Sequence, residues 1–191
     1  AKKVKKESGE TIYDVMYSLA EGRRVTPNSN ILSKKYSVFL GGSFAFGEGL
    51  NDDETLPFYF NKNAKENFNI RNYGFHGYGT HQVHNIVTNQ ILNDSSLINS
   101  ESTDIYYWFI NAHIMRANGY SMWDKDGPYY KLQDESLKYM GSFRKQNQSL
   151  VSKLYNVIWE RSAIYSKIFR SRIATGKKEV DLFLALVKDI D

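Results

Sequence analysis

The chain contains no cysteine, only three prolines in 191 residues, and no long apolar run. The absence of cysteine excludes disulfides, thiol nucleophiles and cysteine-ligated zinc. A membrane-spanning helix needs about 18 consecutive apolar residues, and because no stretch approaches that length we expect no membrane span. No signal peptide is visible, but the chain starts at Ala1 rather than at methionine, so it could be an excised piece of a longer protein and the missing signal is weak evidence.

The chain is only mildly basic, with a formal charge of +4 and an isoelectric point near 9. Four lysines gather within the first six residues, and the others are spread along the sequence. A short basic tip is usually a solvated tail, so we predict that residues 1–10 are disordered and expect no nucleic-acid partner. Residues 11–191 are enough for one domain with a hydrophobic core.

The apolar pattern alternates between segments typical of strands and of helices. Runs rich in β-branched and aromatic residues predict strands over 11–20, 36–41, 68–74 and 104–112. Apolar residues at helical spacing predict helices over 80–92 and 149–173, and another from 177. The run 104–112 is apolar almost throughout, which predicts burial on both faces, and 117–147 is expected to be irregular. The alternation predicts an α/β fold, with a parallel sheet and helices on both of its faces.

Ser43 directly follows the strand predicted over 36–41 and is preceded by two glycines. Glycines let the chain turn sharply, which would leave the Ser43 hydroxyl at the open edge of the sheet beside backbone N–H donors. The local sequence allows two interpretations, a nucleophile or an N-cap that begins the next helical turn. A phosphate-binding loop would need a Gly-Lys-Ser/Thr, and Ala45 stands where the hydrolase elbow Gly-x-Ser-x-Gly needs its second glycine.

Two further motifs follow the other predicted strands. NYGFHGYGTHQ (72–82) holds three glycines. Gly77 could direct an N–H at a developing oxyanion, or the segment is simply a strand-to-helix turn. In FINAHIMR (109–116), Asn111 and His113 offer side-chain donors, or are ordinary structural polar groups. Because the carboxyl ends of parallel strands meet at one edge, we expect these motifs to converge with Ser43.

Two other polar groups carry weaker signals. His81 and His84 are three residues apart on a predicted helix, and two ligands do not define a metal site, so we expect structural or surface roles. Asp52, Asp53 and Glu54 suggest paired acids, but we interpret them as the start of a helix or as a solvated loop.

Three stretches together resemble the SGNH (GDSL-type) hydrolase superfamily, especially its bacterial members. They are FLGGSFAFGEGLNDDETLP (39–57), NYGFHGYGTHQ (72–82) and YYWFINAHIMRANG (106–119), within a resemblance that covers residues 11–145. The resemblance implies an αβα sandwich with a flavodoxin-like parallel sheet, incomplete here at its C-terminus, and a reaction without metal or organic cofactor. Residues 11–191 would then be the N-terminal portion of an SGNH-hydrolase-like domain.

The resemblance also implies roles for individual residues. Ser43 matches the nucleophile, which lends its own N–H to the oxyanion hole, and Gly77 matches the glycine that supplies the next donor. The third block matches loosely, so that either His113 or Asn111 supplies the remaining donor. We slightly favour His113, because a neutral imidazole keeps one N–H. The position of His76 beside Gly77 suggests a contact with substrate.

Two departures from the family pattern affect the expected activity. Gly42 replaces the aspartate of Gly-Asp-Ser, which removes local hydrogen bonds. No Asp-x-x-His occurs, because the residues three before the four histidines are Tyr73, Tyr78, His81 and Ile110. We therefore expect either a general base beyond residue 191 or a natural truncation that lacks it. Loss of a triad member typically lowers the rate by several orders of magnitude.

The residues and the resemblance together predict a serine esterase whose substrate is an acyl ester on an envelope polysaccharide or lipid. Two alternatives stay open: a non-catalytic SGNH-like domain that binds a glycan or a partner, and an O-acyltransferase that uses the same residues. The resemblance implies a bacterial cell-envelope or extracytoplasmic location, and the sequence leaves a cytoplasmic one open. An incomplete sheet would also expose an edge through which the chain could self-associate.

Overall fold

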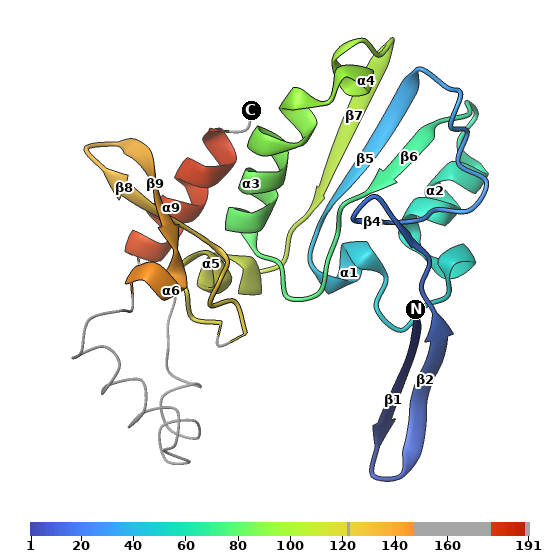
Figure 1. The fold of residues 1–191 in the computed structure, drawn as a ribbon, viewed down its shortest axis with the longest axis horizontal. Helices are drawn as coiled ribbons and strands as arrows, with labels where there is room; N and C mark the ends of the chain where they lie inside the picture. Colours follow the sequence, from blue (N-terminus) through green and yellow to red (C-terminus); the bar gives the residue numbers. More distant parts are fainter. Residues whose placement is uncertain (122, 147–176, 190–191) are drawn as a thin grey trace. The chain divides into compact units, whose positions relative to one another are not determined.

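The computed structural model describes residues 1–121, 123–146 and 177–189, which belong to two compact units (Figure 1). The first unit consists of residues 1–79 and 85–110, and the second of residues 80–84 and 111–191. The helix predicted over 149–173 lies outside the described residues.

The first unit contains a five-stranded sheet with the strand order β3-β4-β6-β5-β7. Strand β5 pairs in parallel with both β6 and β7, whereas β4 pairs antiparallel with β3 and β6. The fold is therefore of the α/β class, as predicted, but the sheet is mixed rather than purely parallel. The strands are β3 (Leu19–Ala20), β4 (Arg23–Arg24), β5 (Lys35–Gly41), β6 (Asn69–Asn72) and β7 (Ser102–Trp108).

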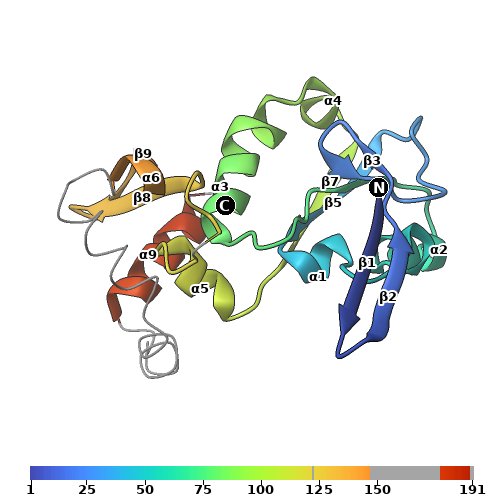
Figure 2. The ribbon, with the colours of Figure 1, turned by 60° about the horizontal axis from the view of Figure 1, so that its bottom comes forward.

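Short helices connect these strands, and α1 directly follows β5 (Figure 2). Helix α2 begins where the Thr55 hydroxyl accepts a hydrogen bond from the backbone N–H of Phe58, with Pro57 in the first turn. Helix α3 (Thr80–Asn89) begins in the second unit and ends in the first, and it confirms the helix predicted there. The others in the first unit are α1 (Ser43–Phe46), η1 (Asp52–Glu54), α2 (Leu56–Asn63), η2 (Ile91–Asn93) and α4 (Ser95–Ile98).

Strands β5 and β7 differ sharply in burial. Residues 36–41 of β5 are all buried, and Val38 is fully enclosed, because β5 has a neighbour on each side. Strand β7 lies at the edge of the sheet, where Ile105 is 48% and Trp108 45% exposed. The prediction that this strand is buried on both faces was therefore wrong. Its apolar composition indicates a strand but does not reveal whether anything covers it.

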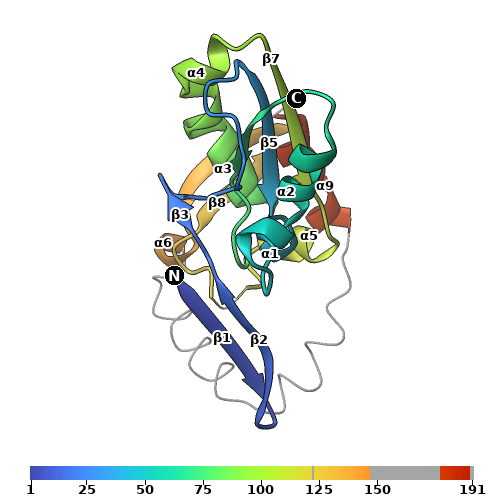
Figure 3. The same cartoon turned by 90° about the vertical axis from the view of Figure 1, so that its right-hand side faces the viewer.

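The first residues of the chain form a β-hairpin, so the prediction of a disordered tail at residues 1–10 was wrong. Strands β1 (Lys2–Glu7) and β2 (Glu10–Met16) pair antiparallel and extend away from the sheet of the first unit (Figure 3). The turn between them places both Ser8 and Gly9 at positive φ, as in a tight two-residue hairpin turn. Nearly every side chain of the hairpin is exposed, and its polar composition therefore looks like that of a tail.

In the part of the second unit that the structure describes, short helices and α9 surround a hairpin that packs beside α9 (Figure 2). The core there includes Ala117, Tyr130, Leu182 and Leu186. The hairpin occupies much of the segment predicted to be irregular, and its turn places Asp134 and Glu135 at positive φ. Asp-Glu is not a preferred sequence for such a turn, so the hairpin was missed. The elements are α5 (Ala112–Ala117), β8 (Pro128–Gln133), β9 (Ser136–Ser142), α6 (Phe143–Gln146) and α9 (Lys177–Lys188), the last confirming the helix predicted from 177.

Over the described ranges, none of the helices has the length and apolar content that a membrane crossing requires.

Candidate active site

Ser43 lies at the carboxyl end of β5, as the first residue of the one-turn helix α1. The turn depends on Gly41, whose φ of +145° is rarely adopted by residues with a side chain. A Cβ at Gly41 would lie 2.8 Å from the carbonyl oxygen of Trp108 on the neighbouring strand. The chain can therefore turn at this point only because no side chain is present at Gly41.

The backbone around Ser43 is held by hydrogen bonds, while its side chain is half-buried. The carbonyl of Ser43 accepts from the N–H groups of Gly47 and Glu48, each at 2.9 Å. The side chain of Gly42 is absent, so the N-cap position before α1 provides no side-chain hydrogen bond. The turn therefore relies on backbone contacts where the family pattern would place an aspartate.

The loop of residues 73–79 packs directly on the Ser43 turn. At Gly74, a Cβ would lie 2.5 Å from the backbone nitrogen of Phe46 and 2.7 Å from the carbonyl carbon of Ala45. Real Cβ atoms do not approach backbone atoms so closely, so glycine is required at this position. Gly74 therefore allows the second motif to lie against the helix that Ser43 begins.

Asn72 joins the same two segments through its side-chain amide. Its Nδ2 donates to the carbonyl of Ala45, and its Oδ1 accepts from the N–H of Gly74, both at 2.9 Å. The N–H of Phe75 then donates to the carbonyl of Gly41 at 3.2 Å. Asn72 is almost completely buried, so these bonds form away from water. Sequence reasoning missed Asn72, although an asparagine at the end of a buried strand is a recognisable signal.

Gly77 lies in the loop that contacts the Ser43 turn through Gly74 and Phe75. Its φ of +75° is in the left-handed region, which glycine adopts without strain. The structure therefore brings the loops of Ser43 and Gly77 together at the carboxyl end of β5 in the first unit. The donor role of the Gly77 amide remains a prediction.

His76 is partly exposed in the same loop and is held by a carboxylate and aromatic rings. Its Nδ1 lies 3.1 Å from Oε2 of Glu48, although the two are not aligned for a hydrogen bond. Its ring centroid lies 4.3 Å from that of Phe46 and 6.0 Å from that of Tyr17. Glu48 and His76 thus form a histidine–carboxylate pair beside the helix that carries Ser43.

Asn111 and His113 belong to the second unit, whereas Ser43, Gly77 and His76 belong to the first. Strand β7 ends at Trp108, so neither residue leaves a strand directly. Asn111 is the exposed N-cap of α5, and His113 is buried within that helix. Burial, followed by the charges of Arg116 and His81, lowers the pKa of His113 to about 4. His113 is therefore neutral near pH 7, and which of the two residues donates to an oxyanion stays a prediction.

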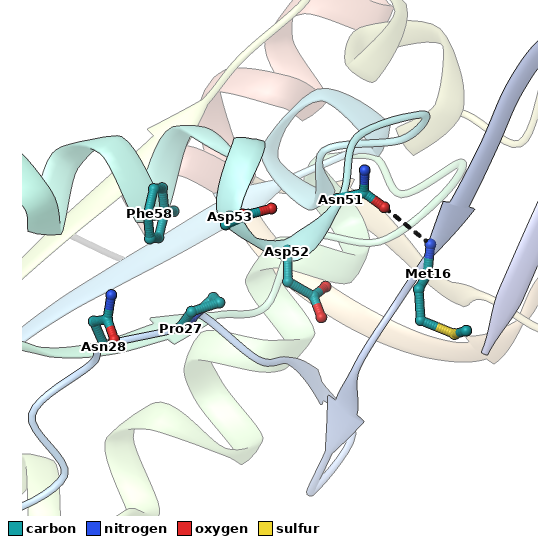
Figure 4. Close-up of a pocket in the computed structure, with 7 residues that line it drawn as sticks. All are labelled: Met16, Pro27, Asn28, Asn51, Asp52, Asp53 and Phe58. Atoms are coloured by element: carbon teal, nitrogen blue, oxygen red, sulfur yellow. Dashed lines mark hydrogen bonds between the residues drawn. The ribbon is translucent and has the colours of Figure 1, made fainter.

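A hollow of about 440 Å³ opens in the first unit, and neither Ser43 nor Gly77 is among the residues that line it (Figure 4). Two of the polar side chains that line it already accept hydrogen bonds from the backbone. Asn51 accepts from the N–H of Met16, and Asp52 accepts from that of Ser18. Residues 52–54 form the short helix η1, which confirms the interpretation of these acids as a helix start. The lining residues are Met16, Pro27, Asn28, Asn51, Asp52, Asp53 and Phe58.

His81 and His84 are buried in the second unit and pair with carboxylates, so they have structural rather than surface roles. Across the described parts of the chain, no cluster of three or more histidine and acidic side chains is arranged to hold a metal ion.

Comparisons with protein-family models and with curated proteins found no match to this chain. Any link to the SGNH superfamily therefore depends on the three sequence motifs and on the way the first two are packed together.

Proposed function

We propose that the chain carries the nucleophile and part of the oxyanion hole of an SGNH-type serine esterase. The observation that supports this most strongly is the close packing of the 73–79 loop on the Ser43 turn. Gly74 leaves no room for a Cβ against Ala45 and Phe46, and Asn72 bonds both segments. Two motifs that are 30 residues apart in the sequence thereby share the carboxyl end of one strand, where α/β proteins bind ligands.

In the proposed reaction, Oγ of Ser43 attacks the ester carbonyl while a base removes the hydroxyl proton. The tetrahedral oxyanion accepts hydrogen bonds from the N–H groups of Ser43 and Gly77. Collapse of the intermediate breaks the bond to the leaving alcohol, which takes up a proton. Water then hydrolyses the acyl-serine and restores Ser43.

The proposed substrate is an acyl ester on an envelope polysaccharide or lipid, in an extracytoplasmic location, as the motif resemblance implies. No Asp-x-x-His occurs in the chain, so the base of the proposed reaction is not assigned to one of its residues. An O-acyltransferase would use the same serine and donors, with a sugar hydroxyl in place of water.

Labelling with a fluorophosphonate tests Ser43 as the nucleophile. The serine oxygen bonds to phosphorus, the P–F bond breaks, fluoride leaves, and the proton passes to water or to added imidazole. We expect peptide mapping to find the label on Ser43, at a rate that rises with added imidazole, because an external base replaces the one the turn lacks. Ser43→Ala should abolish that label.

Ser95→Ala is the matched control. Ser95 is exposed, whereas Ser43 is half-buried, and both begin a one-turn helix of the first unit. The Ser95→Ala variant should be labelled at Ser43 at the same rate as the unchanged chain. Labelling spread over several serines, or unchanged in Ser43→Ala, would contradict the esterase proposal. That outcome would favour the alternative of a non-catalytic binding domain.

A further inference from the structure

Three histidines are buried close to one another in the second unit. His81 is 0%, His84 4% and His113 1% exposed. The first two lie in the opening turns of α3, and the third lies in α5. Histidine is seldom buried so completely in such numbers, because protonating a buried imidazole requires charge in a low-dielectric interior.

His81 connects the start of α3 to the segment before β8. Its Nε2 lies 2.5 Å from Oδ2 of Asp124, and the same carboxylate oxygen accepts from the side-chain amide of Gln82. The ring of Phe143 packs edge-on against the imidazole, with centroids 5.4 Å apart. The opposite ring nitrogen, Nδ1, is buried without a hydrogen-bond partner in the described residues. If His81 is protonated, its Nδ1 carries an N–H for which the described residues provide no acceptor.

His84 connects the start of α3 to the end of α9. Its Nε2 lies 2.7 Å from Oδ2 of Asp189, directly after α9. Its ring packs edge-on against Tyr130, with centroids 4.8 Å apart. Tyr130 in turn belongs to the core with Leu182 and Leu186 of α9. A single imidazole thus joins α3, the β8–β9 hairpin and α9.

His113 is buried near the guanidinium of Arg116 and the imidazole of His81. Burial, then the charge of Arg116 and then His81, lower its pKa to about 4. Burial also lowers the pKa of His81, and this outweighs the opposing effect of Asp124. Both imidazoles are therefore neutral in the folded unit at pH 7.

We propose that the second unit is an acid-sensitive module, in which proton uptake by the buried imidazoles of His81 and His113 releases the β8–β9 hairpin and α9. The inference does not depend on the esterase proposal. The charged and titratable groups facing the histidines come from each element packed around them. Among the described residues they include Arg116 on α5, Asp124 before β8, Tyr130 on β8, and Asp189 after α9.

The direction of the effect follows from proton linkage. An unfolded histidine has a pKa of about 6.5, and His113 has one of about 4 when folded, so acid favours the open state. The stability that depends on a neutral His113 is fully present above about pH 6.5 and declines as the pH falls toward about 4. His113 alone shifts the folding equilibrium roughly 30-fold toward the open state at about pH 5. Burial raises the pKa of Tyr130 to about 12, so that group stays neutral throughout.

Hydrogen exchange followed by mass spectrometry on the full chain tests the proposal over a pH series from about 7.5 to about 4.5. Rates are corrected for the intrinsic pH dependence of amide exchange. We expect peptides from β8, β9 and α9 to lose protection below about pH 6, while peptides from β5 and β6 keep it. His113→Gln, which removes the titration but keeps a polar side chain, should shift the loss of protection to lower pH. His76→Gln, in the first unit, should leave the pH at which protection is lost unchanged.

Two outcomes would overturn the proposal: protection of the second unit unchanged down to about pH 4.5, or simultaneous loss in both units. If His113→Gln does not fold, NMR titration of the histidine ring signals in the unchanged chain decides the question. The proposal expects the signal of His113 to stay in its neutral position until the second unit opens. A reversible titration near pH 6.5, with all native signals retained, would contradict it.

Discussion

The guanidinium of Arg24 lies against the carboxylate of Asp52, with both Nε and Nη2 3.1 Å from Oδ1. Arg24 is 3% exposed and also donates to the carbonyls of Phe46, Gly47 and Leu50. One buried side chain therefore fixes the end of α1 and the start of η1 together. The backbone conformation after Ser43 therefore depends on the hydrogen bonds from Arg24 as well as on its glycines.

Replacing Arg24 with alanine should destabilise the first unit by about 3–5 kcal/mol, because it leaves the partly buried carboxylate of Asp52 and several carbonyls without their donor. Urea unfolding followed by tryptophan fluorescence measures the change. Lys35→Ala is the control, since Lys35 forms only a surface ion pair with Glu66 and should cost less than about 1 kcal/mol. Equal effects from the two variants would contradict the structural role of Arg24.

Gly74→Ala should disrupt the contact between the 73–79 loop and α1, because the new Cβ would meet backbone atoms of Phe46 and Ala45. Overpacking against backbone should cost about 3 kcal/mol and should also reduce fluorophosphonate labelling of Ser43. Gly22→Ala, at φ +72° in open space, should cost about 1 kcal/mol and leave the labelling unchanged. Unfolding curves and the labelling rate together distinguish the two.

Asp94 caps α4 and should contribute stability that depends on pH. Burial raises the pKa of Asp94, but hydrogen bonds from Ser96 and the charge of Arg71 outweigh it, so that the pKa is lowered overall. The stabilisation is therefore present above about pH 4 and is lost as the pH falls further. Asp94→Asn should unfold more easily than the unchanged chain at neutral pH, and the difference should vanish in acid. A difference independent of pH would show that the charge of Asp94 is not involved.

The chain should hydrolyse p-nitrophenyl acetate slowly or not at all, because a serine without its base is a weak nucleophile. Initial rates of the chain and of Ser43→Ala should therefore differ little. A fast reaction that Ser43→Ala abolishes would show that the chain holds its own base. The variant His76→Gln would then test whether His76, which pairs with Glu48, is that base.

The sequence predicted best the elements whose local pattern determines their structure. Strand β5 and helix α3 have strong apolar patterns, and both were confirmed. The turn at Ser43 was also predictable, because Gly41 and Gly42 follow a buried strand directly. The packing of Gly74 on Ala45 could not be predicted, since it depends on how two distant segments approach one another.

The sequence missed two hairpins because their local composition is atypical, and it left the roles of two histidines open because their partners lie far away along the chain. The β1 strand is stabilised by backbone pairing with β2 and by the Lys2–Asp14 ion pair, which its polar composition does not reveal. The β8–β9 hairpin has a turn of unusual sequence. For His81 and His84 the sequence could not decide between a structural and a surface role, because their carboxylate partners, Asp124 and Asp189, lie 43 and 105 residues further along the chain.

A crystal structure of the chain phosphonylated at Ser43 tests the central claim most directly. The phosphoryl oxygen of the adduct occupies the place of the oxyanion. We predict that it lies about 2.7–3.1 Å from the backbone nitrogens of both Ser43 and Gly77. A phosphoryl oxygen that points into solvent, with the Gly77 nitrogen beyond hydrogen-bond reach, would contradict the account.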